Sequence, residues 1–455
     1  MTTTTSVALA IFIITYILIF ALEKARPYIA AASAVVFVVL GILGVLDGYS
    51  YSIGEAVSEI DWNVLMMIAG TMGTVQLFID SGMPRRMSDV IISKTGSVRW
   101  MIVAMSLFAG IVSAFVDNVA TVLMIAPVAL AICRKLDISP VPTIICISIS
   151  SNLQGAATLV GDTTSILLAK AAGLDFMDFF FMKGRPGMFW VTEAGAIASA
   201  LIIIFIFRKE KGKISAGEKF KVEDKVPTVL LVLTILSLIA VSFIPYENAA
   251  KPGEFFKPSW TNGALCMLYF AIGLIRECIK NKSAQPAKKA LWSLDGYTLL
   301  LLAGLFVVIG GIKRAGIIDL LANGIYSLCG GTTRGALFAT FTVIVWMSVL
   351  ISAFIDNIPY VATMLPVVQS LSAQFAASSD SSLANASTLL FFGLLVGATL
   401  GGNLTPVGAS ANITGIGILR KENYTVKPAE FMKYSVPFTL TAVAVGYILL
   451  WIIWA

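Results

Sequence analysis

The sequence predicts an all-α, polytopic membrane protein built from two inverted-topology repeats, each with about five transmembrane helices and one re-entrant hairpin. Three observations lead to this fold class: the composition, the spacing of long apolar runs, and sequence blocks that occur twice. Of the 455 residues, 58% are hydrophobic and 13% are charged, and the mean hydropathy is +0.89. Soluble domains are roughly 45–50% apolar and about 25% charged. The composition therefore indicates an integral membrane protein with many crossings.

The apolar runs set the number of crossings. One crossing needs about 20 mostly apolar residues, so the length allows about ten to twelve. Continuous apolar runs favour helices, because a barrel would have short alternating segments. The runs lie at 7–22, 29–47, 63–80, 100–133, 141–169, 188–207, 227–245, 260–275, 296–312, 335–369, 387–419 and 434–454.

Three blocks of the first half recur in the same order in the second half, which indicates a duplication. Residues 61–82 align with 295–316, residues 117–128 with 356–367, and residues 155–165 with 402–412. The longest polar stretch, RKEKGKISAGEKFKVEDKVP, divides the chain near its middle. We therefore expect a first repeat at 1–207, a cytoplasmic linker at 208–227 and a second repeat at 228–455.

The charged loops predict the topology. Basic loops at 85–99, 208–225, 276–289 and 420–427 should be cytoplasmic, and the acidic loop 47–61 should be outside. These assignments agree only if the runs 100–133 and 335–369 each enter and leave on one side, as re-entrant hairpins. Matching elements then have opposite orientations in the two halves, and both termini lie outside. Such inverted repeats are typical of secondary transporters.

Both hairpin tips carry an acid and an amide, in the phrases SAFVDN (113–118) and SAFIDN (352–357). A charge at the centre of a bilayer costs about 2.5–3.5 kcal/mol on insertion scales, so Asp117 and Asp356 need compensation. One interpretation is that they only cap broken helices. The other is that Asp117, Asn118, Asp356 and Asn357 supply oxygens to a hard cation.

Two polar stretches, 151–165 and 401–412, interrupt apolar runs and predict broken helices. Backbone opened at membrane depth must face protein or a wet cavity, and helix N-termini there favour anions. Gly155, Gly161, Gly402 and Gly408 are explained equally well by close helix packing. The candidate side chains for substrate or ion contact are Asn152, Thr163, Ser165, Asn403, Thr405, Ser410 and Asn412.

Asp162 has no acidic counterpart, because Ala409 occupies the matching position. It is either a proton carrier or the N-cap of a half-helix that starts near Thr163. No Lys or Arg falls in the middle of the hairpin and broken-helix segments. An anion there would need helix dipoles and bound cations, so the charges favour cation binding. Histidine is absent, which excludes imidazole relays, and the basic residues cluster in loops, which gives no nucleic-acid signal.

The stretches FVDNVATVLMIAPV, NLQGAATLVGD and GGNLTPVGASAN resemble the ion transporter superfamily. The resemblance is closest to its branch of arsenite permeases, citrate-transporter-like permeases, NhaD-type sodium/proton antiporters and the melanosomal P protein. It implies a homodimer with a scaffold domain and a mobile, elevator-type transport domain. It also implies that Asn118 and Asn357 bind Na⁺ or substrate. The chain departs from the dicarboxylate-transporting relatives by having Asp-Asn-Val and Asp-Asn-Ile in place of Ser-Asn-Thr.

The sequence therefore predicts an ion-coupled secondary active transporter, and no enzyme. The leading substrate is a small anion, either a carboxylate such as citrate or an oxyanion, with Na⁺ or H⁺ as the coupling ion and no other cofactor. A sodium/proton antiporter and an arsenite efflux permease are the alternatives. A passive channel would show one continuous polar pore, whereas this chain has two mirrored half-sites. The expected surroundings are the lipid bilayer of a prokaryotic-type inner membrane and a second copy of the chain.

Overall fold

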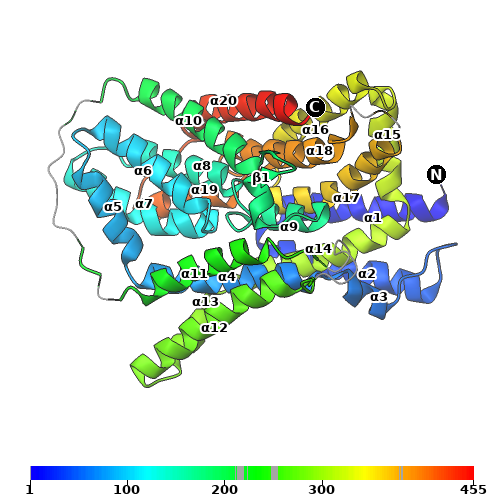
Figure 1. Cartoon of the computed structure of the whole chain (residues 1–455), viewed down its shortest axis with the longest axis horizontal. Helices are drawn as coiled ribbons and strands as arrows, with labels where there is room; N and C mark the ends of the chain where they lie inside the picture. The colour runs from blue at the N-terminus through cyan, green and yellow to red at the C-terminus, as the bar shows by residue number, and fades with distance from the viewer. Residues whose placement is uncertain are drawn as a thin grey trace.

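Every apolar run of the sequence becomes one helix or a pair of helices in the computed structural model (Figure 1). The structure describes residues 2–210, 212, 220–222, 224–246, 255–378, 380 and 383–455. In the first half, the runs form α1 (Thr3–Ala21), α2 (Arg26–Leu43), α4 (Trp62–Asp80), α6 (Val98–Ser113), α7 (Asn118–Lys135), α8 (Val141–Gly155), α9 (Thr163–Ala172) and α10 (Met188–Ile206). In the second half, they form α11 (Val226–Val241), α12 (Thr261–Asn281), α14 (Gly296–Arg314), α16 (Arg334–Ser352), α17 (Asn357–Ala376), α18 (Ala386–Leu395), α19 (Ser410–Lys421) and α20 (Pro428–Trp454).

The described helices agree with the expected number of crossings but not with the expected set. Two arms of the predicted hairpins, α7 and α16, are long enough to span a membrane, whereas α8, α9 and α11 are shorter. Ten of the helical stretches that the structure describes are long and apolar enough to span a membrane. The predicted hairpins correspond to the pairs α6–α7 and α16–α17, and the predicted broken helices to α8–α9 and α18–α19. The turn after α18 begins earlier than expected, with an irregular stretch from Val396 onward.

Several short elements lie where the sequence predicts loops. They are the helices α3 (Ile53–Glu59), α5 (Met83–Ser93), α13 (Gln285–Ser293) and α15 (Ile317–Cys329), the single turns η1 (Glu23–Ala25) and η2 (Phe176–Phe179), and the antiparallel pair β1 (Phe181–Met182) and β2 (Arg185–Pro186). Most of them mix polar and apolar residues, so they contain no continuous apolar run. Two further turns, η4 (Val396–Leu400) and η5 (Gly402–Leu404), lie inside the predicted run 387–419. Gly82 and Gly316 precede α5 and α15 with φ of +71° and +74°, a conformation that favours glycine.

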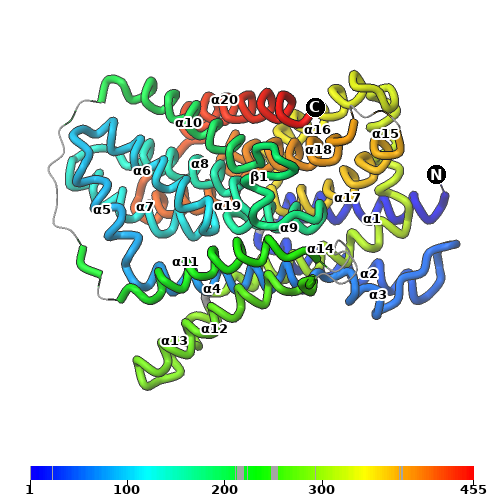
Figure 2. Tube along the Cα trace, in the orientation of Figure 1, coloured from blue at the N-terminus to red at the C-terminus, as the bar shows by residue number. Residues whose placement is uncertain are grey.

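The helices form two groups (Figures 1 and 2). One group, drawn along the lower side, contains α2, α4, α11, α12 and α14. The other contains the hairpins, the broken helices, and α10 and α20, which pack on each other along the upper side. The hairpin tips and the breaks of α8–α9 and α18–α19 therefore belong to the second group.

Glycines bring the helices of the first group close together. A Cβ atom on Gly70 of α4 would lie 2.6 Å from the Met267 backbone nitrogen of α12. A Cβ atom on Gly304 of α14 would lie 2.8 Å from the Ala30 carbonyl carbon of α2. Gly70 and Gly304 occupy matching positions in the duplicated blocks 61–82 and 295–316. The α4–α12 and α14–α2 pairs are thus built on the same small-residue contact.

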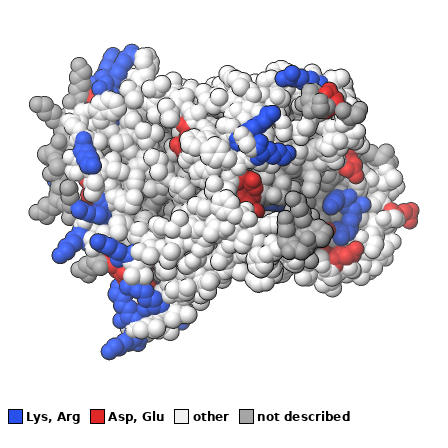
Figure 3. Space-filling model, viewed as in Figure 1, with Lys and Arg blue, Asp and Glu red and all other residues white. Residues whose placement is uncertain are grey.

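Basic side chains gather at one end of the molecule, on the left in Figure 3, where Figure 1 places α5 and α13. Exposed examples are Arg85 on α5 and Lys288 and Lys289 on α13. The two ends of the predicted linker 208–227 that the structure describes are at the same end of the molecule, and residues 211, 213–219 and 223 lie outside the described residues. This grouping is the pattern that the positive-inside rule expects of a cytoplasmic face.

Asp224 ties the end of the linker to α12. Its carboxylate accepts hydrogen bonds from Arg276 and Lys280, at 2.8 and 2.7 Å. Burial raises the pKa of Asp224, but the hydrogen bonds from Arg276 and Lys280 outweigh it and leave that pKa below its usual value. The carboxylate therefore stays ionised at neutral pH and holds the start of α11 against α12.

We predict that Gly70→Ala and Gly304→Ala each lower the melting temperature of the detergent-purified protein. The added methyl group meets backbone atoms that cannot rotate away, and overpacking of this kind costs about 1–3 kcal/mol. Gly417→Ala is the matched control, because no atom lies within 4 Å of a Cβ atom at that helical position. Melting temperatures of Gly70→Ala and Gly304→Ala equal to that of the control would contradict the close helix contacts.

Candidate functional site

Each hairpin tip places its acid at the first turn of a helix. Asp117 accepts hydrogen bonds from the Val119 and Ala120 N–H groups at the start of α7, at 3.0 and 3.1 Å. Asp356 accepts one from the Ile358 N–H group at the start of α17, at 3.2 Å. Both acids therefore cap a helix, and each carboxylate faces the positive end of a helix dipole. The interpretation that they do nothing else is wrong for Asp356, which also binds Arg26 and Ser410.

The turn in each broken helix packs against a hairpin tip. The Thr158 hydroxyl donates to the Ala114 carbonyl, and the Thr405 hydroxyl donates to the Ala353 carbonyl. A Cβ atom on Gly161 would lie 2.7 Å from the Ser113 carbonyl oxygen, and one on Gly408 would lie 2.6 Å from that of Ser352. The glycines thus permit close backbone approach, which supports the packing interpretation for these positions.

Gly155 and Gly402 belong to the same contacts. A Cβ atom on Gly161 would lie 2.6 Å from the Gly155 carbonyl oxygen, and one on Gly408 would lie at the same distance from the Gly402 carbonyl oxygen. Within each turn, the two glycines allow the backbone to approach itself closely. The threonine of the turn forms a hydrogen bond to the hairpin.

Both tips and both half-helix starts meet at one cavity of about 160 Å³. Six of the predicted site residues line it: Asp117, Asn118, Asp162, Thr163, Asn357 and Ser410. The opposite wall comes from the first group of helices, with Met72, Val75, Gln76 and Ile79 of α4 and with Asp295 and Thr298 at the start of α14. The prediction that the two acidic tips lie near each other agrees with this arrangement.

Behind the cavity, a chain of hydrogen bonds joins the two halves of the sequence. Asn118 Nδ2 donates to Asn152 Oδ1 at 3.0 Å, and Asn152 Nδ2 donates to the Thr399 carbonyl at 2.7 Å. The Thr399 and Thr164 hydroxyls lie 2.9 Å apart, and the Thr164 hydroxyl donates to Asp162 Oδ2 at 2.7 Å. All five residues are at most 5% exposed, so the network is shielded from bulk water.

Asp162 stands at the N-cap position of α9 but makes no capping hydrogen bond. Its Oδ2 accepts instead from the Thr164 hydroxyl, and from Asn357 Nδ2 at 3.3 Å. Asp162 therefore occupies the predicted N-cap position of the half-helix, but without a side-chain capping hydrogen bond. Whether it carries a proton stays a prediction.

Asp356 differs from the other acids because a guanidinium neutralises it. Arg26 Nη1 lies 3.2 Å from Asp356 Oδ2, and the two side chains are 9% and 6% exposed. The Ser410 hydroxyl donates to the same oxygen at 2.8 Å. Among the described residues, Asp117, Asp162 and Asp295 have no such ion pair.

Comparison with known proteins identifies the family. Residues 10–391 match the model of the citrate transporter family, CitMHS. This chain belongs to that family. An uncharacterized transporter of Mycobacterium tuberculosis is 32% identical to it over 457 residues, which cover 98% of both chains. The human P protein is 26% identical over 471 residues, which cover 87% of this chain and 54% of that protein.

Two solved structures share the fold of this citrate transporter family member. The YdaH transporter of Alcanivorax borkumensis has 15% sequence identity and a TM-score of 0.62, over 94% of this chain and 98% of its own. MtrF of Neisseria gonorrhoeae, described as illuminating a class of antimetabolite efflux pumps, has 14% identity and a TM-score of 0.56, over 96% and 97%. Family and helices together identify a multi-pass integral membrane transporter.

Three other predicted residues of this family member, Asn403, Asn412 and Ser165, do not line the cavity. The two asparagines form hydrogen bonds to backbone carbonyls. Asn403 Nδ2 donates to the Ile149 carbonyl at 2.8 Å. Asn412 Nδ2 donates to the carbonyls of Gly402 and Thr405, at 3.2 and 3.3 Å. Ser165 is fully buried, and its hydroxyl has no hydrogen-bond partner in the described part of the chain.

Six residues that line the cavity or bond to its lining were not predicted from the sequence: Arg26, Gln76, Asp295, Thr298, Thr164 and Thr399. Two of them could have been found from the duplication. Asp295 begins the second copy of the block that starts at Asp61, and Thr399 is the counterpart of Asn152 at the same offset. Arg26 has no such signal, because it lies between two apolar runs in a stretch that reads as a loop.

We predict that Arg26→Met destabilises the protein by about 3–5 kcal/mol, because it leaves Asp356 buried without its cation. The double variant Arg26→Met/Asp356→Asn should recover most of the loss, since it removes the stranded charge. Thermal unfolding in one detergent compares the variants. A double variant no more stable than the single one would contradict a buried ion pair at this position.

Proposed function

We propose that this protein is an ion-coupled secondary active transporter that carries a small carboxylate such as citrate together with a cation. The observation that carries the proposal is the acidic cavity where both hairpin tips meet. Asp117, Asp162 and Asp295 line that cavity, and no Lys or Arg is among its described lining residues. The family's description as citrate transporters supports a carboxylate as the cargo.

The charges around the cavity explain why the cargo needs a cation. An anion alone would be repelled by three carboxylates at a site with little water to screen them. Hard cations prefer carboxylate and amide oxygens. The acids supply carboxylate oxygens at this cavity, and Asn118 and Asn357 supply amide oxygens. In the part of the chain that the structure describes, no three acids cluster closely enough to hold a metal ion by themselves. Substrate carboxylates would therefore complete the coordination of Na⁺ or of another cation.

We extend the proposal to an elevator-type movement of two inverted repeats. Its support is the set of matched positions in the two halves: Gly70 and Gly304, Asp117 and Asp356, Thr158 and Thr405, and Gly161 and Gly408. The group with the hairpins would move past the group with α4, α12 and α14, which would form the scaffold of a homodimer. Entry of one cation supplies about 2.3 kcal/mol per 100 mV of membrane potential.

A sodium/proton antiporter is the second candidate. The observation that favours it is Asp162, an acid 3% exposed and without an ion pair among the described residues. Such a carboxylate can exchange a proton for Na⁺ without any organic substrate.

Transport by proteoliposomes separates the two functions. We expect labelled citrate to accumulate only under an inward Na⁺ or H⁺ gradient, and more so when a divalent cation is present. Liposomes without protein are the control. A pH dye that responds fully to a Na⁺ gradient in the absence of citrate, with no citrate uptake, would establish the antiporter and overturn the proposal.

We predict that Asp162→Asn removes the pH dependence of transport, because the amide cannot bind and release a proton. The readout is the initial uptake rate across a pH series. Asp162→Glu should retain the dependence, and Asp137→Asn, on an exposed loop, should leave the whole profile unchanged. An unaltered profile in Asp162→Asn would remove this acid from proton coupling.

A further inference from the structure

A second cavity, of about 580 Å³, separates the two groups of helices beside α9. Asn63 and Met67 of α4 and Asn262 of α12 contribute to one wall, and Ile166 and Lys170 of α9 contribute to the other. Atoms that line a void lose the dispersion contacts that close packing would give them. Apolar packing therefore contributes little to holding the groups together along this stretch, and polar contacts between them matter more.

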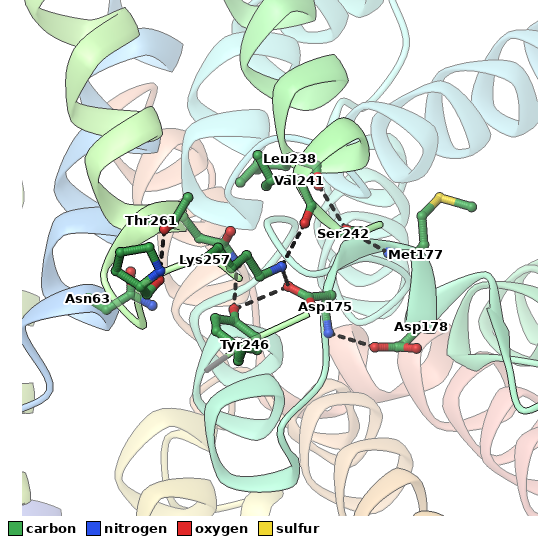
Figure 4. Close-up of polar contacts among 12 residues, drawn as sticks. Asn63, Asp175, Met177, Asp178, Leu238, Val241, Ser242, Tyr246, Lys257 and Thr261 are labelled. Carbon is green, nitrogen blue, oxygen red and sulfur yellow. Dashed lines mark hydrogen bonds and ion pairs between the residues drawn. The ribbon is translucent and has the colours of Figure 1, made fainter. Parts of the chain in front are cut away.

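Asp175 makes such a polar contact from one group to the other. It follows α9 and therefore belongs to the second group, with the hairpins and the broken helices. Its Oδ1 accepts hydrogen bonds from Lys257 Nζ at 2.8 Å and from the Tyr246 hydroxyl at 3.1 Å (Figure 4). Asn262 Nδ2 donates to the oxygen of that hydroxyl at 3.2 Å, which leaves the hydroxyl proton for Asp175. Lys257 precedes α12 and Tyr246 follows α11, so both belong to the first group.

Lys257 is almost completely buried and forms its ion pair with Asp175. The Lys257 side chain is 2% exposed, and that of Asp175 is 13% exposed. The ammonium also donates to the Val241 carbonyl at 2.8 Å and lies 4.3 Å from the centre of the Tyr246 ring. If Asp175 moved away, these two contacts within the first group would remain, but the buried charge would lose this counter-ion. Such a loss is strongly unfavourable, so the ion pair favours the observed position of the second group.

Two weaker contacts join the groups nearby. Lys170 Nζ, on the last turn of α9, lies 3.0 Å from Asp61 Oδ2 at the start of α4. The Lys170 side chain is 52% exposed, so solvent weakens this ion pair. The Met177 N–H group donates to the Ser242 hydroxyl at 3.4 Å. The buried pair of Lys257 and Asp175 is therefore the strongest of these connections.

The half-helix α9 connects this ion pair to the candidate transport site. Thr163, the first residue of α9, lines the transport cavity. At the other end of the helix, two residues separate it from Asp175, and the Leu174 N–H group donates to the Ala169 carbonyl at 2.8 Å. This hydrogen bond fixes the turn to the helix. We therefore expect Asp175 and the start of α9 to move together.

We propose that Lys257 and Asp175 form a latch, which holds the second group in its observed position and opens each time that group moves past the first. This latch presupposes the elevator-type movement proposed above. Neither residue is among those that line the transport cavity, so the latch acts on the position of the site and not on its contacts with ions. Opening it frees α9, and with α9 the part of the site that begins at Thr163.

The position of the two groups can be measured without any transported substrate. Spin labels on Tyr28→Cys of α2 and Lys135→Cys of α7, which are both exposed positions, report the distance between the groups by double electron–electron resonance. Cys278→Ser and Cys329→Ser remove the two partly exposed native thiols from the labelled protein. The measurement uses the full-length protein in nanodiscs.

We expect Lys257→Met/Asp175→Asn to raise the population of a second distance about tenfold or more, because no charge stays buried and unpaired when the group moves. Lys289→Met/Asp80→Asn is the control, because it removes an ion pair within the first group and should leave the distances unchanged. A latch variant with the same distances as the protein that keeps Lys257 and Asp175 would overturn the proposal.

The exposed ion pair provides a second, milder variant. Lys170→Met/Asp61→Asn should shift the distances in the same direction but less, since solvent already weakens that pair. The asparagine can still cap α4. A larger shift than that of the latch variant would contradict the assignment of the latch to Lys257 and Asp175.

A disulfide between the groups tests whether the latch has to open. Met177→Cys/Ser242→Cys places two thiols where a hydrogen bond already joins the residues. We expect oxidation with copper phenanthroline to stop citrate uptake by proteoliposomes, and reduction with dithiothreitol to restore it. Each single cysteine variant, treated in the same way, should transport like the untreated protein.

Continued citrate uptake by the cross-linked protein would mean that the two groups stay joined at this place throughout the cycle, and would overturn the latch. If the untreated protein takes up no citrate, the proposed substrate is wrong, and the distance measurement alone decides whether the latch exists.

Discussion

The structure depends on hydrogen bonds to the backbone groups at helix ends and to the acidic side chains, all of which lie among apolar residues. Helix ends leave N–H and carbonyl groups without partners, and lipid provides none. Here the hairpin tips and the turns of the broken helices supply each other's missing partners. Thr158 and Thr405 bind carbonyls of the tips, and Asp117 and Asp356 accept from the first N–H groups of α7 and α17. Gly161 and Gly408 allow the backbones to approach closely enough for this to happen.

The same backbone arrangement carries different charges in the two halves. Asp356 forms an ion pair with Arg26 and accepts a hydrogen bond from Ser410. Its carboxylate therefore has both a counter-charge and a hydrogen-bond donor. Asp117 lines the cavity without an ion pair among the described residues, and Asp162 adds a second acid where the other half has Ala409. The two matching turns therefore differ: the first half has two acids without an ion pair among the described residues, and the second has one acid paired with Arg26.

Much of the fold follows from local sequence, and less of the site does. Long apolar runs predicted the principal helices, and the doubled blocks predicted that Asp117 and Asp356 stand at equivalent tips. Short helices such as α5 were missed because charged and apolar residues alternate within each turn. Arg26 was missed because its partner is 330 positions away, and a single sequence does not reveal which distant charges meet. The contact of Asn262 with Tyr246, and the cavity beside it, likewise arise only when distant helices pack.

The hydrogen bonds that run from Asn118 through Asn152 to Thr399, and back from Thr399 to Thr164 and Asp162, make each half of the sequence depend on the other. Asn152 finds its acceptor only in the opposite half, as does the hydroxyl of Thr399. Neither half alone contains all the partners that these buried polar groups use. A substitution that removes one of these groups would therefore leave a buried polar group of the other half without its partner.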